Sequence, residues 1–227
     1  MPSRFQSNTY FSHFMAQEIG KKILNATVNT VAPSIAYLLL FESTKFHAIR
    51  LAAENNEQIN SKAREQVQQA YRDMGCENKA IYFCDAGFAF PYTLTSIINP
   101  KVVLFSCKQP KTSEEYDELY ALAGHEAVHT KENHALKNEF GFLIVYNYLR
   151  LHWLTSACTA LAFSLLTLRQ LNKTCEFRAD TVSAQKLHTN FILCRLFHQH
   201  HHDESSFFHP ACKDREANIT GDVQRSF

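Results

Sequence analysis

Hydrophobic and polar positions change their spacing several times along the chain, and each spacing predicts an element. From Ala52 to Met74 apolar residues recur at helical spacing in a polar stretch, and Gly75 follows as a stop signal. Two apolar runs rich in β-forming residues come next, Ala80 to Phe90 and Lys101 to Cys107, with a segment containing Pro and Asn between them. This pattern predicts an amphipathic helix followed by a small antiparallel sheet.

The second half of the chain has a helical pattern. Thr112 and Glu115 form a Thr-x-x-Glu capping box, which predicts a helix that runs to about Asn138. The pattern stays helical up to the run His200 to His202, and Asn172 is a candidate N-cap of a further helix. The expected fold class is therefore α+β and mostly α.

Composition narrows the classes of function. The chain has 227 residues, of which 45% are apolar and 20% are charged. This length and apolar fraction are sufficient for one sizeable hydrophobic core. Its net charge is +1 and its basic residues are scattered, so we expect no nucleic-acid partner. Seven cysteines without a Cys-x-x-Cys pair argue against a disulfide framework and against a cysteine zinc finger. A reducing compartment is the simpler expectation.

Two uncharged stretches bear on a membrane. The first twenty residues show no cleavable secretory signal, so we expect a cytoplasmic or membrane-associated protein. The stretch Ile23 to Phe41 has no charge but contains Asn, Thr and Pro, which leaves both a packed helix and a membrane span open. We divide the chain into a helical segment at 1–50, which packs or lies against a membrane, and one domain at 51–227.

The candidate chemistry lies inside the capped helix, in the sequence HEAVH at 125–129. At 3.6 residues per turn His125 and His129 point to one face and can chelate one metal ion. Glu126 lies on the neighbouring strip, where its carboxylate can reach a metal-bound water. The alternative is that both histidines merely occupy a half-buried helix face.

A hydrolytic zinc site takes three protein ligands, so a third donor is needed downstream. Glu176 is the best candidate, because it lies on a predicted helix. Asp180 is one turn further along and can accept the free ring N–H of a ligating histidine. The alternative is a solvated pair of acidic residues.

Three sequence blocks resemble one known family. They are GHEAVHxxxxH at 124–134, EFRAD at 176–180 and HPxxxxR at 209–215. Their order and spacing resemble the gluzincin zinc metallopeptidases of the HtpX and CAAX-prenyl-protease type, metallopeptidase family forty-eight, over roughly residues 52–219.

The resemblance implies a zincin-like catalytic core with an active-site helix and one Zn²⁺ ion per chain. It implies that the zinc ligands are His125, His129 and Glu176. Glu126 is then the general base, and Asp180 supports a ligating histidine. His209 and Arg215 would flank the catalytic centre, with His209 helping to stabilise the oxyanion.

The substrate-binding edge departs from the family pattern. Relatives carry an Asn-Ala-Phe-like segment on the strand before the active-site helix, and the nearest match here is GFAF at 87–90. Phe88, Ala89 and Phe90 are therefore the candidate substrate-binding residues. An edge strand at 80–90 or 101–107 would let an extended substrate add as a further strand. The alternative is that Phe88 and Phe90 are ordinary core residues.

The apolar stretch Leu151 to Leu168 lies between two predicted ligands. A single membrane crossing would separate His125 from Glu176, which a shared metal ion forbids. Two crossings within Glu139 to Leu171 leave about 16 residues and about 24 Å per helix, less than the ~30 Å of a bilayer core. We therefore predict a helix or helical hairpin that covers the active-site helix, either as core or with an apolar tip that contacts a membrane or partner.

The sequence thus predicts a zinc-dependent endopeptidase that acts on a peptide or protein substrate. Two alternatives remain: a catalytically silent zinc-binding scaffold of the same fold, and an interaction protein that lies against a membrane. The substrate and the oligomeric state are left open.

Overall fold

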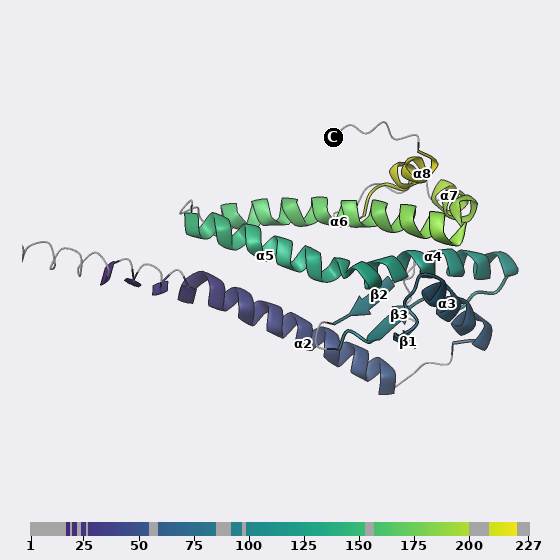
Figure 1. The fold of residues 1–227 in the computed structure, drawn as a ribbon, viewed down its shortest axis with the longest axis horizontal. Coiled ribbons are helices and arrows are strands. Elements are labelled where there is room, and N and C mark those ends of the chain that lie inside the picture. The colour runs from purple at the N-terminus through teal and green to yellow at the C-terminus, as the bar shows by residue number, and fades with distance from the viewer. Residues whose placement is uncertain are drawn as a thin grey trace, which may run out of the picture.

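The computed structural model describes residues 17–18, 20–21, 24–25, 27–54, 59–84, 92–96, 99–152, 157–199 and 209–221. Most of these residues are helical, and a small sheet accompanies the helices (Figure 1). The elements, in chain order, are η1 (Thr27–Val31), α2 (Ala32–Glu54), α3 (Ser61–Asp73), β1 (Ala80–Cys84), β2 (Tyr92–Thr95), β3 (Val102–Ser106), α4 (Ser113–Glu132), α5 (His134–His152), α6 (Ala157–Leu187), α7 (Asn190–Gln199) and α8 (Cys212–Thr220).

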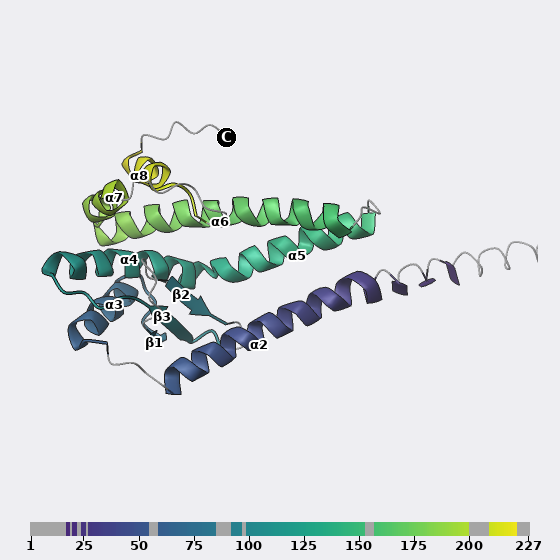
Figure 2. The ribbon, with the colours of Figure 1, turned by 180° about the vertical axis from the view of Figure 1, so that it is seen from behind.

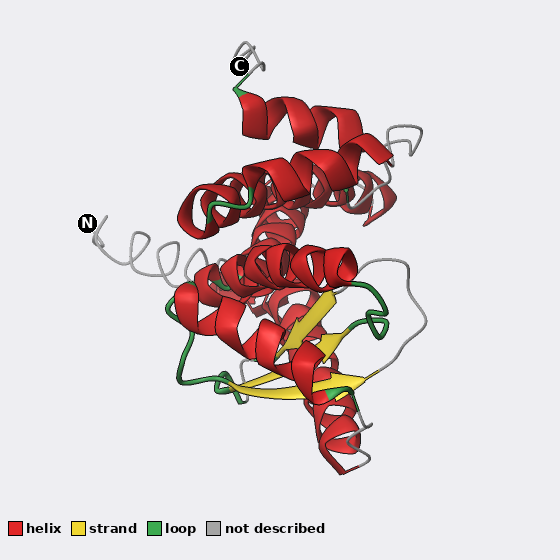
Figure 3. Ribbon diagram, turned by 90° about the vertical axis from the view of Figure 1, so that its right-hand side faces the viewer, coloured by secondary structure: helices red, strands yellow, loops and turns green. Residues whose placement is uncertain are grey.

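The elements form layers around α4. In Figure 1 the sheet lies between α4 and α2, and α6 runs back along α5 and α4 on the opposite side. Helices α7 and α8 lie beyond α6, as the reverse view in Figure 2 and the end-on view in Figure 3 also show. Helix α4 is therefore covered on both sides, and α5 and α6 project together away from the sheet.

The sheet is mixed, so the predicted antiparallel arrangement is wrong in part. The strand order is β1-β3-β2, with β1 parallel to β3 and β2 antiparallel to β3. The segment between the two predicted strands contains β2, which reverses the chain once more and brings β1 and β3 into the same direction. Because β3 is central, the expected edge strand at 101–107 is also wrong. The edges are β1 and β2.

Two helix boundaries differ from the predictions for local reasons. Helix α3 begins at Ser61, because Asn60 caps its first turn by accepting the N–H of Lys62, whereas residues 52–54 belong to α2. The capping box of Thr112 and Glu115 is confirmed, but α4 ends at Glu132. Asn133 takes a left-handed conformation with φ 53°, which breaks the helix that we expected to reach Asn138.

The predicted helical hairpin is present as α5 and α6. Helix α6 is continuous through Asn172, so this residue is not an N-cap. The two helices approach closely at Gly141, where a Cβ atom would lie 2.5 Å from Cδ1 of Leu171. Only the second half of α6 covers α4, and the first half extends with α5 beyond the domain.

The main core lies between α3, the sheet and α4. Phe105 of the central strand is fully buried and makes edge contacts with Tyr71 of α3 and Phe83 of β1. A second cluster joins α4, α6, α7 and α8 around Phe197. These two clusters hold α4 from both sides and fix its position in the domain.

The helix α2 packs on the domain through charged residues. Lys45 Nζ lies 2.5 Å from both Glu42 of its own helix and Glu139 of α5. The hydroxyl of Ser96 donates to the second oxygen of Glu42 over 2.7 Å. In the part of the chain that the structure describes, no helix combines the length and apolar character needed to cross a membrane.

Replacing Phe105 with alanine should lower the free energy of unfolding by about 3–5 kcal/mol, because it empties the centre of the main core. Phe191→Ala is the matched control, since the Phe191 side chain is 78% exposed and its loss should change stability by about 0.5 kcal/mol or less. Denaturant unfolding of both variants measures the difference. Equal stabilities would contradict the assignment of this core.

Candidate metal centre

Three side chains from two helices converge on one point. His125 and His129 of α4 place their Nε2 atoms 3.0 Å apart. The carboxylate of Glu176 on α6 lies 3.5 Å from His125 Nε2 and 3.3 Å from His129 Nε2. One donor atom from each residue falls within 4.8 Å of the others, so this group can hold a metal ion. Two imidazole nitrogens and one carboxylate are a suitable donor set for a transition metal.

The second ring nitrogen of His125 is held by a buried carboxylate. Asp180 is fully buried one turn after Glu176, and its Oδ1 lies 2.8 Å from His125 Nδ1. Arg215 of α8 binds the same carboxylate with two N–H groups, over 2.8 Å from Nε and 2.7 Å from Nη2. This arrangement turns His125 Nε2 toward Glu176.

His129 has a corresponding partner in His134. The two Nδ1 atoms are 3.0 Å apart, and His134 Nε2 lies 3.2 Å from Glu132. Glu132 in turn accepts the Nε–H of Arg178 over 2.7 Å. Five residues along one continuous helix would turn His134 away from His129, but the left-handed turn at Asn133 brings it back against His129.

Glu126 faces the same region from the neighbouring strip of α4. The hydroxyl of Thr93 on β2 donates to Glu126 Oε2 over 2.7 Å. Burial raises the pKa of Glu126, and the charge of His125 and the bond from Thr93 oppose this rise. The carboxylate is therefore desolvated and oriented.

Burial and the nearby carboxylates shift the pKa values of the converging groups and so determine which of them carries a charge. Burial alone would lower the pKa of His125, but Asp180 and then Glu176 outweigh it and raise this pKa to about 10. Burial and the neighbouring His125 lower the pKa of His129 to about 3. Although burial disfavours its charge, hydrogen bonds from His125 and His209 hold the pKa of Glu176 well below its usual range.

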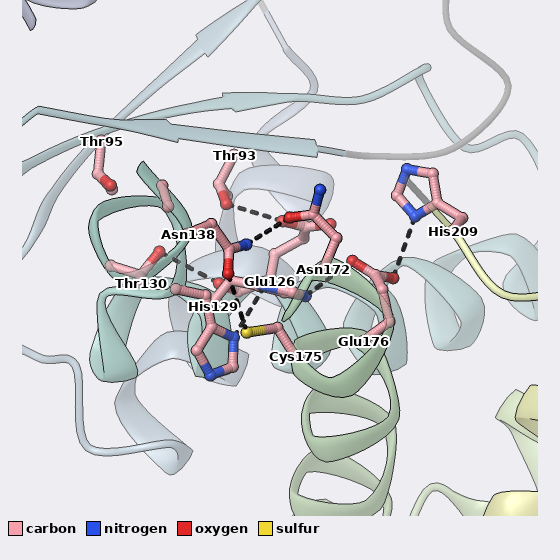
Figure 4. A pocket seen from close by; sticks show the side chains of 12 residues that line it. Thr93, Thr95, Glu126, His129, Thr130, Asn138, Asn172, Cys175, Glu176 and His209 are labelled. Carbon is pink, nitrogen blue, oxygen red and sulfur yellow. Dashed lines mark hydrogen bonds and ion pairs between the residues drawn. The ribbon is translucent and has the colours of Figure 1, made fainter. Parts of the chain in front are cut away.

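A pocket of about 220 Å³ opens onto the converging groups (Figure 4). On the floor of the pocket, the side-chain amide of Asn138 on α5 donates to the side-chain oxygen of Asn172 on α6. The thiol of Cys175 lies 3.6 Å from the side-chain oxygen of Asn138. Much of the lining is polar. The lining residues are Thr93, Thr95, Glu126, His129, Thr130, His134, Ala135, Asn138, Asn172, Cys175, Glu176 and His209.

His209 and Arg215 reach the centre in different ways. His209 lies at the rim of the pocket, with Nδ1 3.2 Å from Glu176 Oε2 and 61% of its side chain exposed. Arg215 lies behind the ligand group, and its Nη2 is 3.5 Å from both Glu176 Oε2 and His125 Nδ1. The candidate substrate-binding residues Phe88, Ala89 and Phe90 lie outside the described residues.

Several residues that line the pocket were not predicted as site residues from the sequence. Thr93 and Thr95 fall in a segment interpreted as a connection, because Pro91 and Pro100 punctuate it, yet it contains β2. Asn138 and Asn172 are 34 positions apart and meet only because α5 and α6 fold back on each other. A hydrophobic pattern contains no information on such cross-helix pairs.

Comparisons of this chain with protein-family models, curated proteins and solved structures give no match. The metal centre is therefore interpreted from its own geometry.

In the metal-free protein, His125 should stay protonated through pH 8 and titrate at about pH 10, whereas His129 should stay neutral down to about pH 3. Because folding raises the pKa of His125, its charged form contributes fully to stability below its unfolded value of about 6.5. That contribution is lost as the pH rises through about 10. Imidazole ¹⁵N chemical shifts measure both histidines, and titration of His125 near pH 6.5 would contradict the assigned network.

Proposed function

We propose that this protein is a zinc-dependent endopeptidase. One observation carries the proposal: His129 and Glu176, two of the three residues that can hold a metal ion, line a pocket together with the oriented carboxylate of Glu126. Holding a metal ion requires only the three ligands. The additional carboxylate is the group that peptide hydrolysis needs for proton transfer.

The donor set favours Zn²⁺. Catalytic zinc sites use three protein ligands drawn from His, Glu, Asp and Cys, and two histidines with one glutamate are a known combination. Asp180 on the far ring nitrogen of His125 fixes the tautomer that leaves Nε2 free to ligate. When bound, zinc supplies Lewis acidity and lowers the pKa of a coordinated water to about 7.

Glu126 moves the proton in this proposal. Thr93 occupies Oε2 of the carboxylate, which leaves Oε1 to accept a proton from the attacking water and to return it to the leaving amine. Burial raises the pKa of Glu126 in the metal-free protein, which is the direction that favours holding the proton before it is returned.

The remaining residues bind and orient. Strand β2 is an edge strand whose Thr93 and Thr95 line the pocket, so an extended peptide can pair with it through main-chain hydrogen bonds. In this proposal His209, which lines the pocket at its rim, donates to the developing oxyanion. Arg215 acts as a positioning residue, because it clamps Asp180 behind the ligand His125.

The alternative of a catalytically silent zinc-binding scaffold shares the three ligands. What separates the two functions is Glu126, which contacts neither Asp180 nor the clamp of Arg215 and instead faces the pocket with Thr93. A scaffold has no use for a desolvated, oriented carboxylate at this place.

Purified protein should contain about one zinc ion per chain, and Glu176→Ala should lose most of it, because the variant leaves only two ligands. Native mass spectrometry with elemental analysis measures the stoichiometry. Glu118→Ala is the matched control, since Glu118 lies on α4 away from the pocket, with Oε1 3.2 Å from Arg195. No zinc in the wild-type protein after reconstitution would contradict the proposed cofactor.

Glu126→Gln should keep its zinc but lower the rate of peptide hydrolysis by about 10²–10⁴-fold, because the amide cannot accept the proton. Hydrolysis of fluorescent casein by the zinc-loaded proteins measures the effect, and Glu118→Gln serves as the control that keeps full activity. Unchanged hydrolysis by Glu126→Gln would rule out this base. A zinc-loaded wild-type protein without activity would favour the scaffold.

A further inference from the structure

The part of the molecule where α2, α5 and α6 project beyond the sheet is almost free of charge (Figure 1). It comprises Ala32–Phe41 of α2, Phe140–Leu149 of α5 and Ala157–Leu168 of α6, which lie at the same end in Figures 1 and 2. We call this part the apolar end. Between Glu139 and Arg169 the sequence has one residue among Asp, Glu, Lys and Arg, which is Arg150, and residues 23–41 have none.

The apolar end has small or polar residues inside and large apolar residues outside. Its buried positions are Ser34, Ala160 and Ser164, and Ser34 bonds to Asn147 across the contact between α2 and α5. Its exposed positions include Leu40 at 70% and Ile144 at 65%. A water-soluble domain has the opposite distribution, whereas helices that pack in lipid bury small residues and turn large apolar ones outward.

On α2 and α6 the exposed apolar side chains spread over more than one face of the helix, whereas those of α5, Phe140, Ile144 and Tyr148, form one stripe. Leu39, Leu40 and Phe41 are consecutive exposed positions of α2, and consecutive residues point about 100° apart around a helix. On α6 the exposed Leu161, Phe163 and Leu166 point in directions spread over about 200°. A second protein chain covers one face of a helix, but acyl chains surround it. The geometry therefore favours lipid over a protein partner.

A cavity between the helices has the same character. It measures about 530 Å³ and lies between α2, α5 and α6. Most of its lining is apolar: Pro33, Ser34, Tyr37, Phe142, Leu143, Tyr146, Ala157, Cys158, Leu161 and Leu165. Acyl chains fill such a space without leaving polar groups unsatisfied.

We propose that the apolar end inserts into the hydrocarbon layer of a lipid bilayer from one side, without crossing it. About 13 residues of α5 beyond Glu139 reach about 20 Å, which exceeds one leaflet of ~15 Å and is less than the ~30 Å core. Helix α6 returns to the metal centre, so His125 and Glu176 remain on the same side. Arg150 near the end of α5 is the one residue among Asp, Glu, Lys and Arg that this part of the hairpin would bring into the hydrocarbon layer.

The charges at the base of the apolar end are compatible with this position. Toward the domain, the first charged residues are Glu42 and Lys45 of α2 and Glu139 of α5, and they pair with one another, with Lys45 Nζ 2.5 Å from each carboxylate. The buried group neutralises most of its own charge where the helices leave the domain. Insertion of α2 and α5 therefore does not bring an unpaired charge of Glu42, Lys45 or Glu139 into the lipid.

Flotation with unilamellar vesicles of phosphatidylcholine tests the proposal. The wild-type protein should float with the vesicles, and the double variant Ile144→Glu with Leu166→Glu should partition at least tenfold less, because both carboxylates would enter the hydrocarbon layer. Both positions are exposed, so circular dichroism should show unchanged helix content. Phe191→Glu is the control for each single variant, Ile144→Glu and Leu166→Glu, because it places one carboxylate on an exposed apolar position of α7 and should float like the wild type.

The depth is measured with the single tryptophan of the chain, Trp153, which follows α5 in the sequence. Lipids brominated deep in the acyl chain should quench its fluorescence more than lipids brominated near the headgroup. Wild-type protein that stays out of the vesicle fraction, or a double variant that floats normally, would overturn the proposal. The proposal would also be overturned if the wild-type protein formed a dimer without vesicles and the double variant were a monomer. Because these readouts need neither metal nor substrate, they are independent of the peptidase activity.

Discussion

The close approach of α4 and α6 is the constraint on which the rest of the structure depends. A Cβ atom at Gly124 would lie 2.1 Å from Cδ1 of Leu187, so the absence of a side chain lets the two helices meet directly before the first ligand. His125 and His129 lie on one of these helices and Glu176 on the other. A wider separation would leave two histidines without the carboxylate and would remove the metal centre.

Around this contact, His125, His129 and Glu126 are each oriented by a neighbour from a different element. Asp180 and Arg215 hold His125 from α6 and α8, and His134 holds His129 from α5. Thr93 holds Glu126 from the sheet. Because these neighbours are themselves packed or paired, the donor atoms are preorganised and ordering them on metal binding costs little conformational entropy. Burial lowers the pKa of both histidines, and the two carboxylates of Asp180 and Glu176 outweigh it only at His125, so the two pKa values shift in opposite directions.

Helix α6 connects the two proposed activities of the molecule. Its second half carries Glu176 and Asp180 into the metal centre, and its first half carries Leu161 and Leu166 into the apolar end. A peptidase whose active-site helix pair continues into lipid would hold its pocket at a fixed distance from the bilayer surface. Substrates at that surface would then reach the pocket at a high local concentration.

The sequence by itself determined the helical content, the capping box of α4, the helical hairpin and the identity of the three metal-ligating candidates, because these depend on local spacing and residue chemistry. Tertiary structure alone decided the parallel pairing of β1 with β3, the break at Asn133 that returns His134 to His129, and the meeting of Thr93 with Glu126. These features arise from contacts between residues that are distant in sequence or from a reversal of chain direction. A hydrophobic period describes which face of an element is apolar, but it does not specify which element will cover that face.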